Sequence, residues 1–199
     1  MIKLSILIRS THTRSATFLP VFMDRIFAQL EGLEIKDQNQ IEILVLVDNK
    51  KMMLGTKRNE MFNIAQGEYV AFADDDDVLE PDYLISLLNA TESGADIIVF
   101  KVNVTLNGGA PKICTYSKNY DTDFNTDNGY FRLPNHIMCV KKDLAMAVKY
   151  LPIVYGEDSD YSRRLKAHLK TEHVIDKVLY NYAWDIETTE TQFHLKGLK

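Results

Sequence analysis

Residues 68–77 read Glu68-Tyr69-Val70-Ala71-Phe72-Ala73-Asp74-Asp75-Asp76-Asp77. The apolar part predicts a buried strand, and the four aspartates fall where that strand ends and solvent begins. A run of like charges is usually a solvated loop, because such charges repel one another. The position favours a ligand site instead: open α/β sheets bind ligands at the carboxyl ends of their strands, and Mg²⁺ or Mn²⁺ takes oxygen ligands.

The residues around this stretch predict alternating strands and helices. Residues 4–8 are a β-branched apolar run followed by polar residues that suggest a loop, and residues 17–30 have helical apolar spacing. Residues 41–47 are nearly continuous Ile, Leu and Val, the pattern of a parallel strand buried on both faces. With a helix at 56–65, the order up to the aspartates is β-α-β-α-β, as in nucleotide-binding folds.

The second half of the chain is less regular. Helical patterns occupy residues 82–91, 142–150 and 158–169, and strand patterns occupy 96–102, 137–140 and a short piece at 173–175. Residues 105–129 have the composition of hairpins and loops. We therefore expect an α/β fold with a Rossmann-like, mostly parallel central sheet flanked by helices. A smaller β region is expected in the second half of the chain.

Composition indicates a single globular domain over residues 1–199. The chain is 46% hydrophobic and 26% charged, which is ordinary for such a domain. A net charge of −5 argues against a nonspecific nucleic-acid binder. No apolar stretch approaches the roughly 20 residues of a membrane-spanning helix, and the start does not resemble a secretory signal. We expect a cytoplasmic protein in which Cys114 and Cys139, which lack metal-ligand spacing, are structural.

Polar side chains should meet at one edge of the predicted sheet. Parallel strands bring their carboxyl ends together, so Thr11, Asp48 and the aspartates Asp74 to Asp77 are expected to converge. A nucleoside diphosphate fits such a pocket for two reasons. A carboxylate can accept hydrogen bonds from ribose hydroxyls, and a carboxylate-bound metal can neutralise the pyrophosphate. Arg58 is either a phosphate or base donor in this pocket or a solvent-facing helix residue.

A second group of acids lies at Gly156-Glu157-Asp158-Ser159-Asp160. These acids fall in the first turn of a predicted helix, where the helix dipole favours negative charge. Stabilisation of the helix start is sufficient to explain why acids occur at these positions. The functional alternative is a carboxylate that faces a pocket and accepts a proton from an attacking hydroxyl.

Taken in order, the motifs of this chain resemble those of the family-2 nucleotide-sugar glycosyltransferases, which have the GT-A fold. The resemblance covers about 190 residues and is carried by residues 5–14, Asp48, Lys57-Arg58-Asn59, Gly67 to Asp77, Pro81-Asp82-Tyr83-Leu84, Gly156-Glu157-Asp158 and Leu179-Tyr180-Asn181-Tyr182. A lone Asp-x-Asp is weak evidence, whereas the ordered set is specific.

The resemblance implies roles for particular residues. Donor-binding residues would be Thr11, Asp48, Arg58, Asp74 and Asp75, with Asp48 at the nucleoside and Asp74 and Asp75 on the ribose and base side. Asp76 would bind Mn²⁺ or Mg²⁺, and His194 would add a metal ligand. Asp158 would be the general base of an inverting transfer in one displacement. By the same resemblance, residues 1–103 form the donor half, and residues 104–199 form the half with the acceptor site and the base.

The acceptor side is expected to involve Glu157 and His136. His136 could instead be structural. The aromatics Tyr116, Tyr120, Phe124 and Tyr130 either stack on a sugar or base or form a small core cluster. The expected acceptor is a glycan or lipid-linked saccharide.

Two loops depart from the family pattern. Arg9-Ser10-Thr11 replaces the usual Pro-Thr, and Asp48-Asn49-Lys50 replaces Asp-Gly-Ser or Asp-Ser. Both loops shape the pocket for the donor base, so a UDP-sugar is the default donor. The run of four acids also allows Asp75 and Asp77 to be the metal pair, although Asp77 is otherwise expected only to shape the turn.

Three alternative functions remain open on sequence grounds. One is transfer to a hydroxylated nucleobase in DNA, which the acidic balance disfavours. Another is a sugar-phosphate nucleotidyltransferase, which usually carries a Gly-rich phosphate loop, whereas residues 10–15 contain no glycine. The third is a binding module without activity, against which the intact Asp76 and Asp158 argue.

Overall fold

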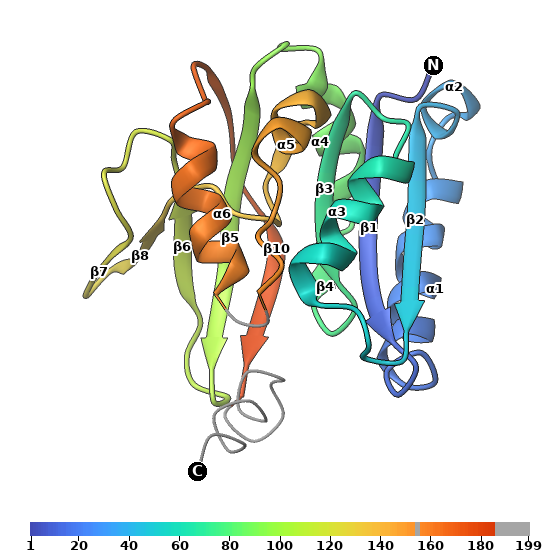
Figure 1. Ribbon diagram of the computed structural model, residues 1–199, viewed down its shortest axis with the longest axis horizontal. Helices are drawn as coiled ribbons and strands as arrows, with labels where there is room; N and C mark the ends of the chain where they lie inside the picture. The colour runs from blue at the N-terminus through green and yellow to red at the C-terminus, as the bar shows by residue number, and fades with distance from the viewer. Residues whose placement is uncertain (154–155, 186–199) are drawn as a thin grey trace.

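The structure is a computed structural model that describes residues 1–153 and 156–185 (Figure 1). Its strands are β1 (Leu4–Thr11), β2 (Ile41–Asp48), β3 (Tyr69–Asp74), β4 (Val78–Leu79), β5 (Ile97–Leu106), β6 (Lys112–Tyr116), β7 (Phe124–Thr126), β8 (Gly129–Arg132), β9 (Cys139–Lys141) and β10 (Glu172–Trp184). Its helices are α1 (Phe18–Glu31), α2 (Ile35–Gln38), α3 (Leu54–Ile64), α4 (Tyr83–Thr91), α5 (Lys142–Val148) and α6 (Glu157–Lys166).

The strands of these residues join in one sheet. Its order is β2-β1-β3-β9-β5-β6-β8-β7, and β10 pairs with β5 and β4. The pairs β1/β2, β1/β3 and β5/β10 are parallel, while β9 runs antiparallel to both β3 and β5. Figure 1 shows α3, α5 and α6 on one face of the sheet and α1 and α4 on the other. The predicted α/β class is confirmed.

The β1 to β3 unit has the predicted parallel order, with one correction. β2 is not buried on both faces: it is the edge strand, most of its residues are half-buried, and Val47 is 42% exposed. The almost completely buried strands are its neighbour β1 and, beyond β1, β3. β1 also continues to Thr11, so Ser10 and Thr11 extend the strand instead of beginning a loop.

The C-terminal region also differs from the sequence-based expectation. The short strand predicted at residues 173–175 is the start of the 13-residue β10, which continues through Tyr180-Asn181-Tyr182 to Trp184. The pairing with β5 shifts register between Ile175 and Val178 and again before Tyr180. Such irregularities hide the alternation that identifies a strand in sequence. No helix in the described part of the chain is long and apolar enough to cross a membrane.

Candidate active site

The strand ends converge as predicted. Thr11 pairs with Asp48 in register, and Arg9 pairs with Asp74 on the other side of β1. The His12 N–H also donates to the carbonyl oxygen of Asp48, at 2.8 Å. The carboxyl ends of β1, β2 and β3 therefore form one polar edge.

Asp74 is the last residue of β3 and pairs with two cationic or polar groups. Its Oδ1 lies 3.0 Å from Arg9 Nε, and its Oδ2 lies 3.4 Å from His136 Nε2. Burial opposes ionisation of Asp74, but Arg9 and His136 outweigh it and hold the pKa of this carboxyl well below its usual range. Asp74 is therefore a fixed carboxylate.

Asp75 and Asp76 share one arginine. Arg14 Nη2 pairs with Asp75 and lies 2.6 Å from Asp76 Oδ1. Asp75 is buried and also accepts the Ser10 hydroxyl at 2.5 Å, whereas Asp76 is exposed. Asp75 thus anchors the loop after β1, and Asp76 is the member of the run most accessible to a ligand from solvent.

Asp77 does more than shape the turn, which corrects the expectation. It lines a pocket beside the end of β3 and accepts a hydrogen bond from the Tyr180 hydroxyl at 2.7 Å. Tyr180 in turn accepts the backbone N–H of Asp74 at 3.0 Å. Burial, then the negative charge of Asp74, raises the pKa of Asp77 well above its usual range. The pKa of Asp74 is therefore lowered and that of Asp77 is raised, although both acids lie at the end of β3.

Asp48, at the end of β2, is held by contacts with residues that follow it in the chain. It pairs with Lys57 and accepts the backbone N–H groups of Lys51 and Met52 at 2.9 and 3.0 Å. Burial opposes ionisation, but the Lys57 hydrogen bond and the Met52 N–H lower the pKa of Asp48. Lys57 Nζ also donates to the Ser10 carbonyl at 2.9 Å, so this lysine ties β1 to the end of β2.

Arg58 is buried, which decides between its two sequence-based interpretations. Its side chain is 1% exposed, and its guanidinium lies 4.6 Å from the Phe72 ring centroid and 5.3 Å from that of Tyr150. Its Nε lies 3.5 Å from Glu157 Oε1. Within the described part of the chain, Arg58 Nη1 has no hydrogen-bond partner. Arg58 therefore faces the pocket, not solvent.

The start of α6 presents the second group of acids. Gly156 has a φ of 79°, a left-handed conformation that favours glycine, and α6 begins directly after it. The Glu157 side chain is buried against Arg58. Asp158 is half-buried, and its Oδ1 accepts the backbone N–H of Ser159 at 2.7 Å. Both acids line the pocket, and Glu157 also anchors the helix start through Arg58.

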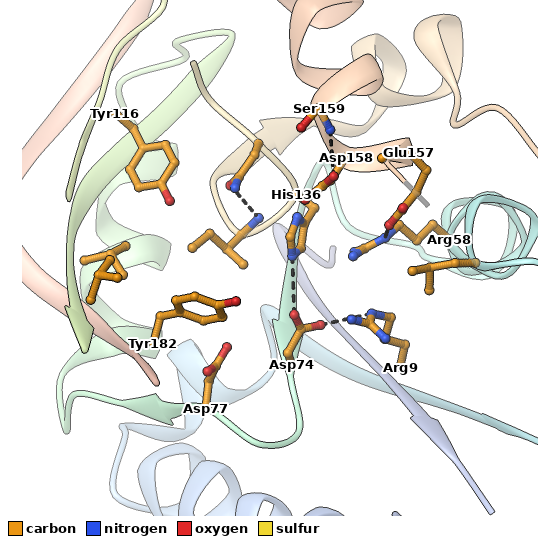
Figure 2. Close-up of a pocket in the computed structure, with 16 residues that line it drawn as sticks. Arg9, Arg58, Asp74, Asp77, Tyr116, His136, Glu157, Asp158, Ser159 and Tyr182 are labelled. Atoms are coloured by element: carbon orange, nitrogen blue, oxygen red, sulfur yellow. Dashed lines mark hydrogen bonds and ion pairs between the residues drawn. The ribbon is translucent and has the colours of Figure 1, made fainter. Parts of the chain in front are cut away.

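These groups surround one pocket of about 440 Å³ (Figure 2). Figure 2 shows Glu157 and Asp158 on one side and Asp74 and Asp77 on the other, with His136 between them. The predicted site residues that line it are Arg58, Asp74, His136, Glu157 and Asp158. Thr11, Asp48, Asp75 and Asp76 lie at the same sheet edge but outside its lining. His194 lies outside the described residues.

Several residues that line the pocket had no role assigned from the sequence, among them Arg9, Tyr182 and Asn135. Arg9 was noted only as a departure from the family pattern, although an arginine in a buried strand already requires an acidic partner. Tyr182 was named only as part of the motif Leu179-Tyr180-Asn181-Tyr182, because its pairing in β10 was not visible from the sequence. Asn135 directly precedes His136, which was predicted for the acceptor side.

Fold and site together define a class: a GT-A-like α/β domain with acids at the carboxyl ends of parallel strands and a further acid across the pocket. The family described as "Glycosyl transferase family 2" matches residues 22–146, which is more than half of the chain. The chain therefore belongs to glycosyl transferase family 2. This confirms the expected family.

Solved structures of TarS from S. aureus share the fold. TarS 1-349 in complex with UDP-GlcNAc has a TM-score of 0.67 at 16% identity, covering 99% of this chain and 65% of that chain. The complex of TarS 1-349 with UDP gives 0.66 at 16% identity, with 94% and 62% covered. A longer TarS structure gives 0.65 at 14%, with 99% and 39% covered. The present chain spans less than two thirds of each, and no curated protein matches it.

Proposed function

We propose that the chain transfers a sugar from a nucleoside-diphosphate sugar to a hydroxyl group of a saccharide acceptor, with inversion at the anomeric carbon. The observation that carries the proposal is the single pocket lined by Asp74, at the end of β3, and by Asp158, at the start of α6. Family membership and the nucleotide-bound relatives support this donor class.

Asp158 is proposed as the general base. Its half-buried carboxylate lines the pocket while Ser159 N–H holds Oδ1, so one oxygen is fixed in direction by the backbone. A base must lie within hydrogen-bond reach of the hydroxyl from which it removes a proton. The buried Arg58–Glu157 pair fixes the helix start that carries Asp158. Direct displacement then needs no covalent intermediate.

The donor is proposed to bind along the strand-end edge. Arg9 and His136 keep Asp74 ionised, and a fixed carboxylate is suited to accept ribose hydroxyls. Thr11, Asp48 and Asp75 shape the neighbouring loops, and Arg58 provides a buried positive charge. A UDP-sugar remains the default donor, since UDP and UDP-GlcNAc are the nucleotides in the TarS complexes.

A divalent cation fits the donor set at this edge. Asp76 offers an exposed carboxylate, and Mg²⁺ is commonly held by one or two carboxylates together with substrate phosphates. The described residues contain no group of three or more His, Cys, Asp or Glu side chains that would form a metal site alone, and a shared site needs none. When bound, Mn²⁺ or Mg²⁺ would neutralise charge on the departing diphosphate. Arg14 already pairs with Asp76, so a cation would share this carboxylate or displace Arg14.

A stabilisation screen tests the donor class. We expect UDP with Mn²⁺ to raise the melting temperature of the chain, because a ligand that binds only the folded state stabilises it, by about 2.7 kcal/mol at 100 times its Kd. Thermal unfolding is followed with UDP, GDP, ADP, CDP and dTDP, each with and without Mn²⁺. Stabilisation by another diphosphate would replace uridine as the donor base. No stabilisation by any of them would overturn the proposed function.

A further inference from the structure

A second hollow adjoins the pocket on the side away from the donor edge. We call it the aromatic groove; it has a volume of about 450 Å³. Val104, Tyr116 and Tyr182 line both the pocket and the groove, so the two lie directly next to each other. The residues that line the groove alone are Leu106, Cys114, Asn125, Tyr130, Arg132 and Trp184.

Strand register explains why its aromatic rings gather on one surface. Alternate residues of a strand share a face of the sheet. Tyr180, Val102, Cys114 and Tyr130 are register partners across β10, β5, β6 and β8. Tyr182 and Trp184 follow Tyr180 at two-residue intervals and therefore stand on the same face. The ring of Tyr130 from β8 and those of Tyr182 and Trp184 from β10 thus belong to one surface.

The chemistry of this surface fits a sugar ring better than a nucleic acid. Among the described residues that line the groove, Arg132 alone carries a charge. Its Nη1 donates to the carbonyls of Phe124 and Phe131 at 2.9 and 3.0 Å, and its guanidinium lies 5.3 Å from the Tyr130 ring centroid. These two hydrogen bonds of Arg132 therefore hold the β7–β8 hairpin together. Binding of a nucleic-acid backbone needs several basic side chains, and the chain has a net charge of −5.

The tyrosine and tryptophan rings offer flat apolar faces with a polar edge. A pyranose ring has apolar C–H faces and a rim of hydroxyls, so it can stack on such rings while Asn125 contacts a hydroxyl. We propose that the aromatic groove binds saccharide units of the acceptor beyond the unit whose hydroxyl reacts. This inference rests on the proposed function, because the adjoining pocket supplies the place of reaction.

Trp184 makes the test direct, since it is the only tryptophan in the chain. The labelled full chain is first applied to an array of diverse oligosaccharides, without donor or metal. Those that bind are then titrated while the Trp184 emission is recorded. We expect at least one oligosaccharide to change this emission saturably, and its monosaccharide to bind more weakly, because a longer ligand occupies more of the groove.

Substitutions connect the signal to the groove. Tyr130→Ala, read by Trp184 emission, and Trp184→Ala, read by calorimetry, should each weaken oligosaccharide binding about tenfold, the typical effect of losing one stacking ring. Trp184→Phe retains a ring and should restore most of the affinity. Phe27→Ala is the matched control, because Phe27 is a 41% exposed aromatic on α1, away from the groove, and it should bind as wild type does.

The outcomes distinguish this inference from the proposed function. Stabilisation by UDP should be unchanged in the Tyr130 and Trp184 variants, which also shows that they fold. If UDP fails to bind wild type but oligosaccharides do, the groove stands and the donor assignment falls. The groove assignment is overturned if no oligosaccharide changes Trp184 emission, or if only a single-stranded oligonucleotide does. It is also overturned if the emission shifts with protein concentration alone, which would indicate that a second copy covers the surface.

Discussion

Replacing Asp158 by Asn should lower turnover about 10²- to 10⁴-fold, the usual contribution of a general base. The amide cannot accept the proton of an attacking hydroxyl, although it keeps nearly the shape of the carboxylate. Donor affinity should stay close to that of wild type, because Asp158 lies across the pocket from the strand-end edge. Turnover is measured as release of nucleoside diphosphate, and affinity by calorimetry with UDP and Mn²⁺.

The neighbouring acid Asp160 provides a matched control for this prediction. It lies in the same first turn of α6, but it pairs with Arg164 at 2.5 Å and does not line the pocket. Asp160→Asn should therefore retain turnover. Loss of donor binding in Asp158→Asn would assign Asp158 a structural role at the helix start, where acids also stabilise the helix dipole.

Replacing Asp76 by Asn should abolish the part of donor binding that depends on a divalent cation. An amide oxygen is a weaker ligand for a hard cation than a carboxylate, and Asp76 is the exposed member of the run. In Asp76→Asn, the positive charge of Arg14 is paired with Asp75 alone. Arg14 therefore repels a divalent cation at this site more strongly. The measurement is the Mn²⁺-dependent difference in UDP affinity, determined by calorimetry in wild type and variant.

Asp82→Asn is the control for the substitution of Asp76. Asp82 is a nearby acid just before α4, and it pairs with Lys177 instead of facing the aspartate run. This variant should keep the full Mn²⁺ dependence. An unchanged Mn²⁺ dependence in Asp76→Asn would instead move the ligand role to Asp75 or Asp77.

The donor half of the fold was predictable because its signals are local. Apolar runs identified β1, β2 and β3, and the rule that parallel strands align their carboxyl ends placed Thr11, Asp48 and Asp74 at one edge. Burial of β2 was misjudged because an edge strand and a central strand can have the same apolar composition. Which strand is at the edge is decided by the strands that pair elsewhere.

The pocket depends on contacts between residues far apart in sequence. The burial of Arg58 depends on Phe72, Tyr150 and Glu157, which belong to three separate segments. The pocket role of Asp77 depends on Tyr180, in a strand whose register shifts conceal its periodicity. Motif order still placed Asp158 among the candidate site residues, and Asp158 lines the pocket, since the family resemblance encodes long-range proximity that local patterns do not contain.

The stereochemistry of the product tests the central claim most directly. UDP-GlcNAc, or the sugar nucleotide chosen by the stabilisation screen, is incubated with the chain and Mn²⁺, and water serves as acceptor when no saccharide is added. The configuration of the released sugar is read by proton NMR before mutarotation equilibrates the anomers. The proposed single displacement with Asp158 as base predicts that the first sugar released has the anomeric configuration opposite to that of the donor. Initial release with the configuration of the donor would contradict it.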